Sequence, residues 1–213
     1  MHVLISGANR GIGAAMADRM TARGDDVTRT ARDAKDHLPL DVADPSSVGR
    51  LASELGDRPI DLLVCNAGVF EDRGGTLGDG FPPDMWARMF AINVTGAFLC
   101  VQALLPNLRA AKGKVALISS QLGSSENASG GSYIYRSSKA AMINLGRNLA
   151  MDLKSDGIAV GIYHPGWVQT DMGGSGAAIS PETSAKGLID RFDALSVATT
   201  GRFETYDGSA HPF

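Results

Sequence analysis

The sequence is poor in cysteine, has no long apolar run and carries no large excess of charge of either sign. Its two cysteines, Cys65 and Cys100, lie inside apolar stretches, so we expect buried thiols in a reducing compartment rather than a disulfide. No apolar run approaches the roughly 18 residues that a membrane-spanning helix needs. The net charge is only −3. This balance gives no reason to expect nucleic acid or a membrane surface as a partner.

The sequence also lacks internal repeats, low-complexity tracts and linkers. A first strand is expected from His2, which leaves no room for a signal peptide, so we expect a cytoplasmic protein. A length of 213 residues suits one domain with a sizeable core. We therefore expect a single domain over residues 1–213.

Short apolar runs alternate with helix-like segments along the whole chain. Strands are expected near residues 2–6, 26–30, 38–41, 60–65, 115–119, 158–163 and 202–205. Helices are expected at residues 14–22, 44–55, 84–109, 134–155 and 182–192, with a glycine-rich loop at 70–83. The alternation predicts an α/β Rossmann fold: a doubly wound, seven-stranded, mostly parallel sheet with helices on both faces.

Glycine, in contrast to cysteine, is abundant, and three glycines separate the first strand from the first helix. Gly7, Gly11 and Gly13 allow a tight turn and a close approach to a pyrophosphate at the helix N-terminus. Their spacing, Gly-x-x-x-Gly-x-Gly, differs from the common Gly-x-Gly-x-x-Gly fingerprint. The order of strand, glycine turn and helix nevertheless indicates a dinucleotide site.

Polar or small residues follow the remaining strands at the positions where ligands gather in such a sheet. They are Arg32 after the second strand, Asp41 after the third, Asn66 after the fourth, Ser120 after the fifth and Pro165-Gly166 after the sixth. Because the carboxyl ends of parallel strands meet at one edge, we expect these residues to form one site.

The end of the second strand governs the choice of cofactor. A carboxylate there would accept hydrogen bonds from the ribose and favour NAD, whereas guanidinium groups would pair with a 2′-phosphate. Arg32, together with Arg10 in the glycine turn, favours NADP(H), although the neighbouring Asp33 leaves NAD(H) open. Asp41 either accepts a bond from the adenine amino group or is an ordinary turn residue.

Tyr135 and Lys139 lie four residues apart at the head of the helix expected at 134–155. This spacing puts both side chains on one helix face, one turn apart, whereas Tyr133 lies off that face. An ammonium near a phenol favours the phenolate, so we expect Lys139 to lower the pKa of Tyr135. Such a tyrosine would serve as an acid or base near neutral pH.

With these residues, the chain resembles the classical branch of the short-chain dehydrogenase/reductase family along nearly its whole length. The matching pieces are Gly7-Ala8-Asn9-Arg10-Gly11-Ile12-Gly13, Asn66-Ala67-Gly68, Asn93, Ser119-Ser120, Tyr135-x-x-x-Lys139 and Pro165-Gly166-Trp167-Val168-Gln169-Thr170. The resemblance implies that Tyr135 is the catalytic acid or base and that Lys139 binds the nicotinamide ribose. It also implies that Ser120 hydrogen-bonds the substrate oxygen and that Asn93 holds a water on the proton path.

The expected cofactor site draws on every segment of this set, and no metal is expected. Its residues are Gly7, Asn9, Arg10, Gly11, Ile12, Gly13, Arg32, Asp41, Val42, Asn66, Ala67, Gly68, Tyr135, Lys139, Pro165, Gly166, Val168 and Thr170. Thr170 is expected to reach the nicotinamide carboxamide, with capping of the loop near Asp171 as the alternative.

Two features depart from the family's pattern. Ser120 lies fifteen residues before Tyr135, an unusually long interval, which leaves Ser119 as an alternative. Strand alternation turns these adjacent serines to opposite faces, so only one of them can face the site. His164 stands before Pro165 where the family often has asparagine, and we expect it to be structural.

The short loop at residues 171–178 suggests an open substrate pocket, edged by Leu122, Phe70, Trp167 and Met172. The predicted function is therefore an NADP(H)-dependent oxidoreductase that acts on a small or medium carbonyl or alcohol substrate. A nucleotide-binding signalling or sensor protein without turnover is the alternative. The helices at 84–109 and 134–155 are candidate surfaces for a homodimer or homotetramer, although their apolar faces also have to cover the sheet.

Overall fold

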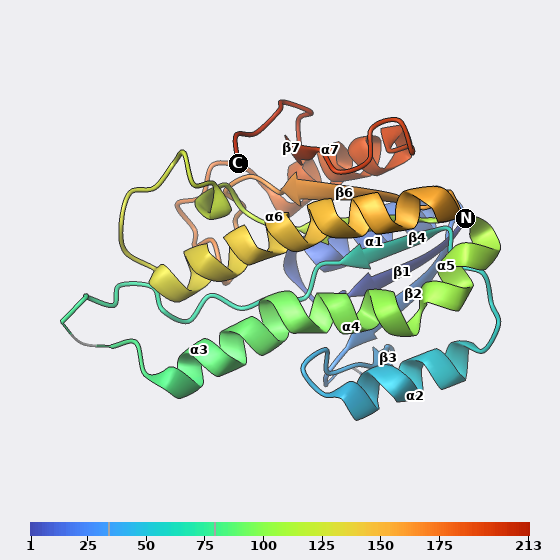
Figure 1. The fold of residues 1–213 in the computed structure, drawn as a ribbon, viewed down its shortest axis with the longest axis horizontal. Helices are drawn as coiled ribbons and strands as arrows, with labels where there is room; N and C mark the ends of the chain where they lie inside the picture. The colour runs from blue at the N-terminus through green and yellow to red at the C-terminus, as the bar shows by residue number, and fades with distance from the viewer. Residues whose placement is uncertain (34, 79) are drawn as a thin grey trace.

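A seven-stranded sheet forms the centre of the molecule (Figure 1). The computed structural model describes residues 1–33, 35–78 and 80–213; residue 79, in the loop expected at 70–83, and residue 34 lie outside this range. The strands are β1 (His2–Ser6), β2 (Asp26–Ala31), β3 (Leu38–Pro39), β4 (Leu62–Cys65), β5 (Lys114–Ile118), β6 (Ala159–His164) and β7 (Phe203–Thr205). Their order is β3-β2-β1-β4-β5-β6-β7 and every neighbouring pair is parallel, which confirms the doubly wound Rossmann fold.

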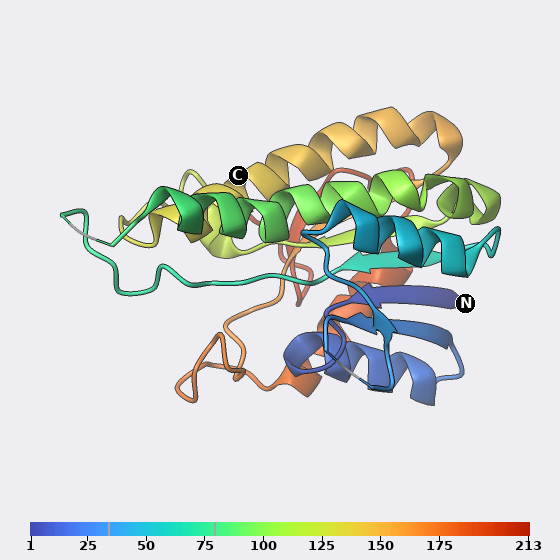
Figure 2. The same ribbon diagram turned by 90° about the horizontal axis from the view of Figure 1, so that it is seen from below.

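Helices cover both faces of the sheet, as Figure 2 shows with α1 in blue on one side and the green and gold helices on the other. One face carries α2 (Pro45–Leu55), α4 (Gly96–Ala103), α5 (Leu105–Ala111) and α6 (Tyr133–Leu153). The other carries α1 (Gly11–Ala22) and α7 (Pro181–Ala194). Each strand therefore needs apolar side chains on both faces.

The strand residues alternate between two hydrophobic cores. Leu4 and Leu63 belong to the core under α2, α4 and α6, whereas Val3 and Val64 belong to the core under α1 and α7. This division follows from the period of two along a strand. Burying both faces in this way explains why these strands read as continuous apolar runs in the sequence.

Both cysteines are buried and unpaired, as expected. Cys65 ends β4 and Cys100 lies in α4, within the same core. Burial raises the pKa of the Cys100 thiol to about 12, because the apolar surroundings disfavour a thiolate. These thiols are packing residues with no reactive character.

The expected start of α2 is confirmed. The Asp44 side chain accepts a hydrogen bond from the backbone N–H of Ser46 at 2.9 Å, and Pro45 occupies the first helical position. In the described part of the connection from β2 to β3 there is no helix, which also agrees with expectation.

The single long helix expected at residues 84–109 is wrong. The chain forms α3 (Pro83–Phe90), a π-helical turn (Ala91–Thr95), α4 and α5, with a bend of 59° between Ala103 and Leu105. Pro106 causes the bend, because it has no N–H to donate to the preceding turn and its ring crowds that turn. The π-helical turn surrounds Asn93, whose side chain bonds outside the helix.

Within residues 1–33, 35–78 and 80–213, no single helix has both the length and the apolar character to cross a membrane. One bent pair, Pro83–Ala103 with Leu105–Ala111, meets those requirements by length and composition alone.

Candidate functional site

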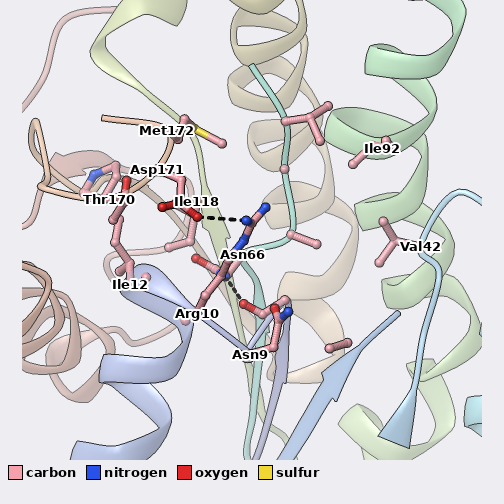
Figure 3. Close-up of a pocket in the computed structure, with 18 of the residues that line it drawn as sticks. Asn9, Arg10, Ile12, Val42, Asn66, Ile92, Ile118, Thr170, Asp171 and Met172 are labelled. Carbon is pink, nitrogen blue, oxygen red and sulfur yellow. Dashed lines mark hydrogen bonds and ion pairs between the residues drawn. The ribbon is translucent and has the colours of Figure 1, made fainter. Parts of the chain in front are cut away.

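A cavity of about 490 Å³ opens at the carboxyl ends of the strands, where the crossovers from β1 and from β4 run in opposite directions (Figure 3). Open α/β sheets bind ligands at this position. Sixteen of the expected cofactor residues line it: Gly7, Asn9, Arg10, Gly11, Ile12, Gly13, Arg32, Asp41, Val42, Asn66, Ala67, Gly68, Tyr135, Lys139, Pro165 and Thr170. Five of the six strand ends singled out in the sequence therefore lie around this cavity, and the sixth, at Ser120, lines a neighbouring cavity.

The glycine turn brings backbone close to backbone beneath this cavity. A Cβ on Gly13 would lie 2.2 Å from the carbonyl oxygen of Gly7, so only glycine fits there. Gly7 and Gly11 have φ values of +68° and +56°, in the left-handed region that favours glycine. This packing lets α1 begin directly beside the end of β1.

The N-terminus of α1 suits an anionic group. No side chain caps it and no acidic residue lies in its first turn, whereas the ends of α2 and α7 are capped by Asp44 and Ser180. No side chain therefore occupies the first N–H groups of α1, and a pyrophosphate could accept hydrogen bonds from them. The helix dipole favours a negative charge at this position. These residues fit a nicotinamide dinucleotide.

Ser6 connects the glycine turn to the end of β4, a role that the sequence analysis missed. Its hydroxyl accepts hydrogen bonds from the backbone N–H groups of Asn66 and Ala67, both at 3.0 Å. The Asn66 side-chain amide donates in return to the carbonyls of Ser6 and Gly7, also at 3.0 Å. The one available clue was a polar residue at the end of an apolar strand.

At the opposite end of the cavity, Arg32 and Asp33 are both exposed and both line the wall. Arg10 differs from expectation, because its guanidinium pairs with Asp171 at 2.8 Å across the cavity mouth (Figure 3). Asp41 lines the cavity, and its Oδ1 also accepts the N–H of Ala43 at 2.9 Å in a local turn.

Tyr135 and Lys139 lie on one face of α6, as their spacing predicted, and both side chains are buried. The Lys139 ammonium lies 5.6 Å from the centre of the Tyr135 ring and donates to the carbonyl of Ile118 at 2.9 Å. Burial lowers the pKa of Lys139 to about 8. The Lys139 amine is therefore mostly protonated at pH 7 and loses its charge as the pH rises through about 8.

The expected direction of the Tyr135 pKa is wrong. Burial raises it to about 12, and this outweighs the opposing effects of a hydrogen bond with Ser120 and of the Arg73 charge. The physical reason is that the free energy lost when a phenolate is removed from water exceeds the stabilisation that Ser120 and Arg73 give it. Tyr135 is therefore a protonated phenol at neutral pH, the form that can act as an acid.

The two candidate serines have different partners. The Ser119 hydroxyl donates to the carbonyl of Lys139 at 2.9 Å and so ties β5 to α6. The Ser120 hydroxyl shares a hydrogen bond with Tyr135 and accepts the N–H of Leu122 at 3.1 Å. Ser120, rather than Ser119, is thus the serine beside the tyrosine, in agreement with strand alternation.

Asn93 is fully buried in the π-helical turn, and its amide is engaged. Its oxygen accepts the N–H of Val69 at 2.8 Å, while its nitrogen donates to the Val69 carbonyl at 2.9 Å and to Ser138 at 3.0 Å. A Cβ on Gly68 would lie 3.3 Å from the Asn93 oxygen and 3.5 Å from the Lys139 ammonium. Asn93 therefore joins the chain after β4 to α6, close to Lys139.

A second cavity of about 280 Å³ meets the first at Tyr135. It contains Ser120 and the four edging residues that the sequence suggested, namely Leu122, Phe70, Trp167 and Met172. Gly166 and Val168, expected in the cofactor site, line this second cavity instead. The Thr170 hydroxyl accepts the N–H of Gly173 at 3.0 Å, so in this structure it caps the loop.

Asp72 is a second residue that the sequence analysis missed. Its carboxylate is buried and accepts the N–H groups of Ile134 at 2.7 Å and Tyr135 at 3.3 Å. It thereby caps α6 from the loop after β4, since Ser132 provides no side-chain cap. No periodic pattern in the sequence marks a cap that comes from a distant loop.

His164 ends β6 and is buried beside the second cavity. Burial, reinforced by the nearby His211, lowers the pKa of its imidazole to about 4. His164 is therefore neutral at physiological pH and adds no charge to this cavity.

The family model for short chain dehydrogenases matches residues 1–178, most of the chain. The chain belongs to this family. It is 35% identical to 1-hydroxy-2-glutathionyl-2-methyl-3-butene dehydrogenase of Rhodococcus sp. over 224 residues, covering 97% of each protein. It is also 41% identical to the C-signal protein of Myxococcus xanthus over 157 residues, covering 73% of this chain and 93% of that protein.

Among solved structures, this short-chain dehydrogenase is similar to the NADPH-bound carbonyl reductase from chicken fatty liver. The TM-score is 0.91 at 29% identity, and the match covers 100% of this chain and 98% of the other. The protein is thus a short-chain oxidoreductase of CH–OH and C=O groups that works with a nicotinamide cofactor.

Proposed function

We propose that the protein is an NADP(H)-dependent oxidoreductase that transfers a hydride between nicotinamide and a small or medium carbonyl or alcohol substrate. The observation that carries this proposal is the meeting of two cavities at Tyr135. One cavity suits a dinucleotide, and the other is lined by Ser120, several apolar side chains and Arg73. Tyr135 lines both cavities, so a substrate carbonyl in the second cavity would lie between the nicotinamide and this residue.

The preference for NADP(H) rests on the arginines around the ribose end. Arg32 lines the cavity and is exposed, so its guanidinium can turn to a 2′-phosphate. Arg10 can bind the same phosphate only if it breaks its ion pair with Asp171. Breaking that pair costs little free energy, because both side chains are more than 70% exposed. The NADPH-bound carbonyl reductase supports the same choice by similarity. Asp33 is the feature that would favour NAD(H).

The chemistry follows from the protonation of the site. When bound, the nicotinamide supplies or accepts the hydride at the substrate carbon. In the direction of reduction, Tyr135 donates its proton to the carbonyl oxygen, since its high pKa keeps it protonated at neutral pH. The Ser120 hydroxyl donates to the same oxygen as charge develops there. The nearby Lys139 ammonium then stabilises the phenolate that remains.

The other site residues have positioning or binding roles in this proposal. Lys139 binds the nicotinamide ribose, and Asn93 keeps the chain after β4 in register with α6 while a water near it continues the proton path. Thr170 reaches the carboxamide after giving up its loop bond to Gly173. Gly166 and Val168 border the nicotinamide from the substrate side.

We also propose that the protein is a homodimer or homotetramer, in which the copies associate through the helical segments at residues 84–109 and 134–155. Phe98 in α4 and Met151 in α6 are exposed apolar side chains, and these helices lie on the same face of the sheet. Light scattering of the purified protein measures the mass directly. A mass of one chain at micromolar concentration would contradict this assembly.

The likeness to the C-signal protein favours one rival, a nucleotide-binding signalling protein without turnover. Fluorescence titration with NADPH and NADH, followed by a screen of aldehydes and ketones, separates the two. We expect tighter NADPH binding, carbonyl reduction, and loss of turnover in Tyr135→Phe with nucleotide binding retained. Binding without turnover of any carbonyl by the wild type would favour the rival, and full activity of Tyr135→Phe would refute the role of Tyr135.

A further inference from the structure

The second cavity carries a single formal charge. Of the described residues that line it, Arg73 alone is charged, because the remaining ones are apolar, glycine or neutral polar residues and His164 is held neutral by burial. None of the described residues places a carboxylate in the wall of this cavity. A lone cation in a small cavity lined otherwise by uncharged groups favours an anionic ligand.

Aromatic stacking connects the Arg73 guanidinium to Tyr135 through the Phe70 ring. Its central carbon lies 4.7 Å from the centre of the Phe70 ring, a cation–π contact. The Phe70 ring stacks in turn on Tyr135, with centres 4.1 Å apart and planes within 15°. One aromatic ring therefore separates the guanidinium from the tyrosine. A substrate whose carbonyl meets Tyr135 could place a second polar group, a few bonds away, at Arg73.

The guanidinium keeps most of its hydrogen-bonding capacity. One of its nitrogens donates to the backbone carbonyl of Met172, and an arginine has five N–H donors. The acidic neighbours are engaged elsewhere: Glu71 pairs with Arg88, and Asp72 caps α6. In the described ranges no carboxylate pairs with Arg73. A charged fork is thus available to a ligand at the mouth of the cavity.

We propose that Arg73 binds a carboxylate on the substrate, so that the protein selects carbonyl compounds that carry a carboxylate a few bonds from the reacting carbon. This inference rests on the proposed carbonyl chemistry at Tyr135. A charge-assisted bond from a guanidinium fork to a carboxylate gives a preference of about tenfold or more over an uncharged analogue. Because Arg73 is exposed, added salt weakens that preference.

The test compares 4-carboxybenzaldehyde with its methyl ester, two aldehydes that differ in charge but share the reacting group. The ratio of their kcat/KM values is measured in the wild type, Arg73→Met and Arg73→Lys with NADPH. Any change in the chemistry at Tyr135 affects both substrates and cancels in the ratio. Arg50→Met is the matched control, since Arg50 lies on α2 in an exposed pair with Asp44 and lines neither cavity.

We expect the wild type and Arg50→Met to prefer the carboxylate by about tenfold or more, and Arg73→Met to lose that preference. Arg73→Lys should keep part of it, because the charge remains but the fork does not. A wild-type preference for the ester, or the same ratio in Arg73→Met as in the wild type, would overturn the inference.

A binding measurement separates this inference from the proposed function. Calorimetric binding of terephthalate and of its neutral dimethyl ester to the protein saturated with NADP⁺ requires no turnover. If neither aldehyde is reduced, the proposed function fails. Terephthalate binding that weakens at least tenfold in Arg73→Met would still support the carboxylate site, whereas unchanged binding would refute it.

Discussion

Replacing Ser6 with alanine tests the junction on which the cofactor site is built. The Ser6 side chain is buried, and its single oxygen accepts two backbone N–H groups, those of Asn66 and Ala67, at 3.0 Å. Alanine removes this acceptor without opening space for a replacement. The N–H of Ala67 would then lose its acceptor, whereas the N–H of Asn66 keeps the carbonyl of Val64 at 3.1 Å.

The magnitude follows from the number of donors left unsatisfied. A backbone N–H that loses its partner inside the protein costs about 1–3 kcal/mol, and Ser6→Ala removes the acceptor of one such group, the N–H of Ala67. This is a large part of the roughly 5–15 kcal/mol that stabilises a typical domain. For a chain of this length it corresponds to a decrease in Tm of roughly 2–12 °C.

Urea unfolding followed by circular dichroism measures this loss, with Ser53→Ala as the matched control. The Ser53 hydroxyl donates to the carbonyl of Gly49 at 3.0 Å on an exposed helix surface, so its removal should change stability by less than about 0.5 kcal/mol. A loss below about 1 kcal/mol for Ser6→Ala, or one equal to the control, would refute this reasoning. We also expect weaker NADPH binding, because Asn66 and Ala67 line the cofactor cavity.

Two further predictions concern charge. Burial lowers the pKa of Lys139 to about 8, so its ammonium is present below that pH and lost above it. We therefore expect kcat/KM for reduction to fall as the pH rises through about 8. A flat profile between pH 7 and 10 would contradict the role of this charge. Asp171→Asn should free Arg10 for the 2′-phosphate and tighten NADPH binding by about two- to fivefold with little effect on NADH, as measured by fluorescence titration, because an exposed pair contributes about 0.2–1 kcal/mol. Equal changes for both nucleotides would show that Arg10 does not contact the phosphate.

The sequence pattern predicted the order of strands and helices well, because a strand buried on both faces leaves a short apolar run that local reading detects. It failed at residues 84–109, where apolar residues continue through two breaks. The bend comes from Pro106, which is a local feature of the sequence. The π-helical turn depends on bonds between Asn93 and Val69, which lie 24 residues apart. No local pattern contains that contact.

The site residues also divide into those that local sequence patterns predict and those that depend on distant contacts. Residues at strand ends, such as Gly7 and Asn66, were predicted because topology alone brings them together. The direction of the Tyr135 pKa was not, since spacing reports that Lys139 is near but says nothing about burial. Asp72 and Arg73 lie in a loop without periodicity. Their roles exist only once that loop packs against α6 and the chain near Met172.

The contacts around the two cavities differ in a way that bears on substrate range. The first turns of α6 are anchored by buried bonds from three other segments, through Asp72, Ser119 and Asn93. The segments at the cavity mouths, which would form a cover over a bound substrate, are joined by exposed groups instead, Arg73 to Met172 and Arg10 to Asp171. Buried, satisfied bonds fix a geometry, whereas exposed pairs exchange with water at little cost. Tyr135 and Lys139 therefore stay in place while the cover adapts, so differences in substrate preference should arise in the cover, at Arg73 above all, rather than in the catalytic helix.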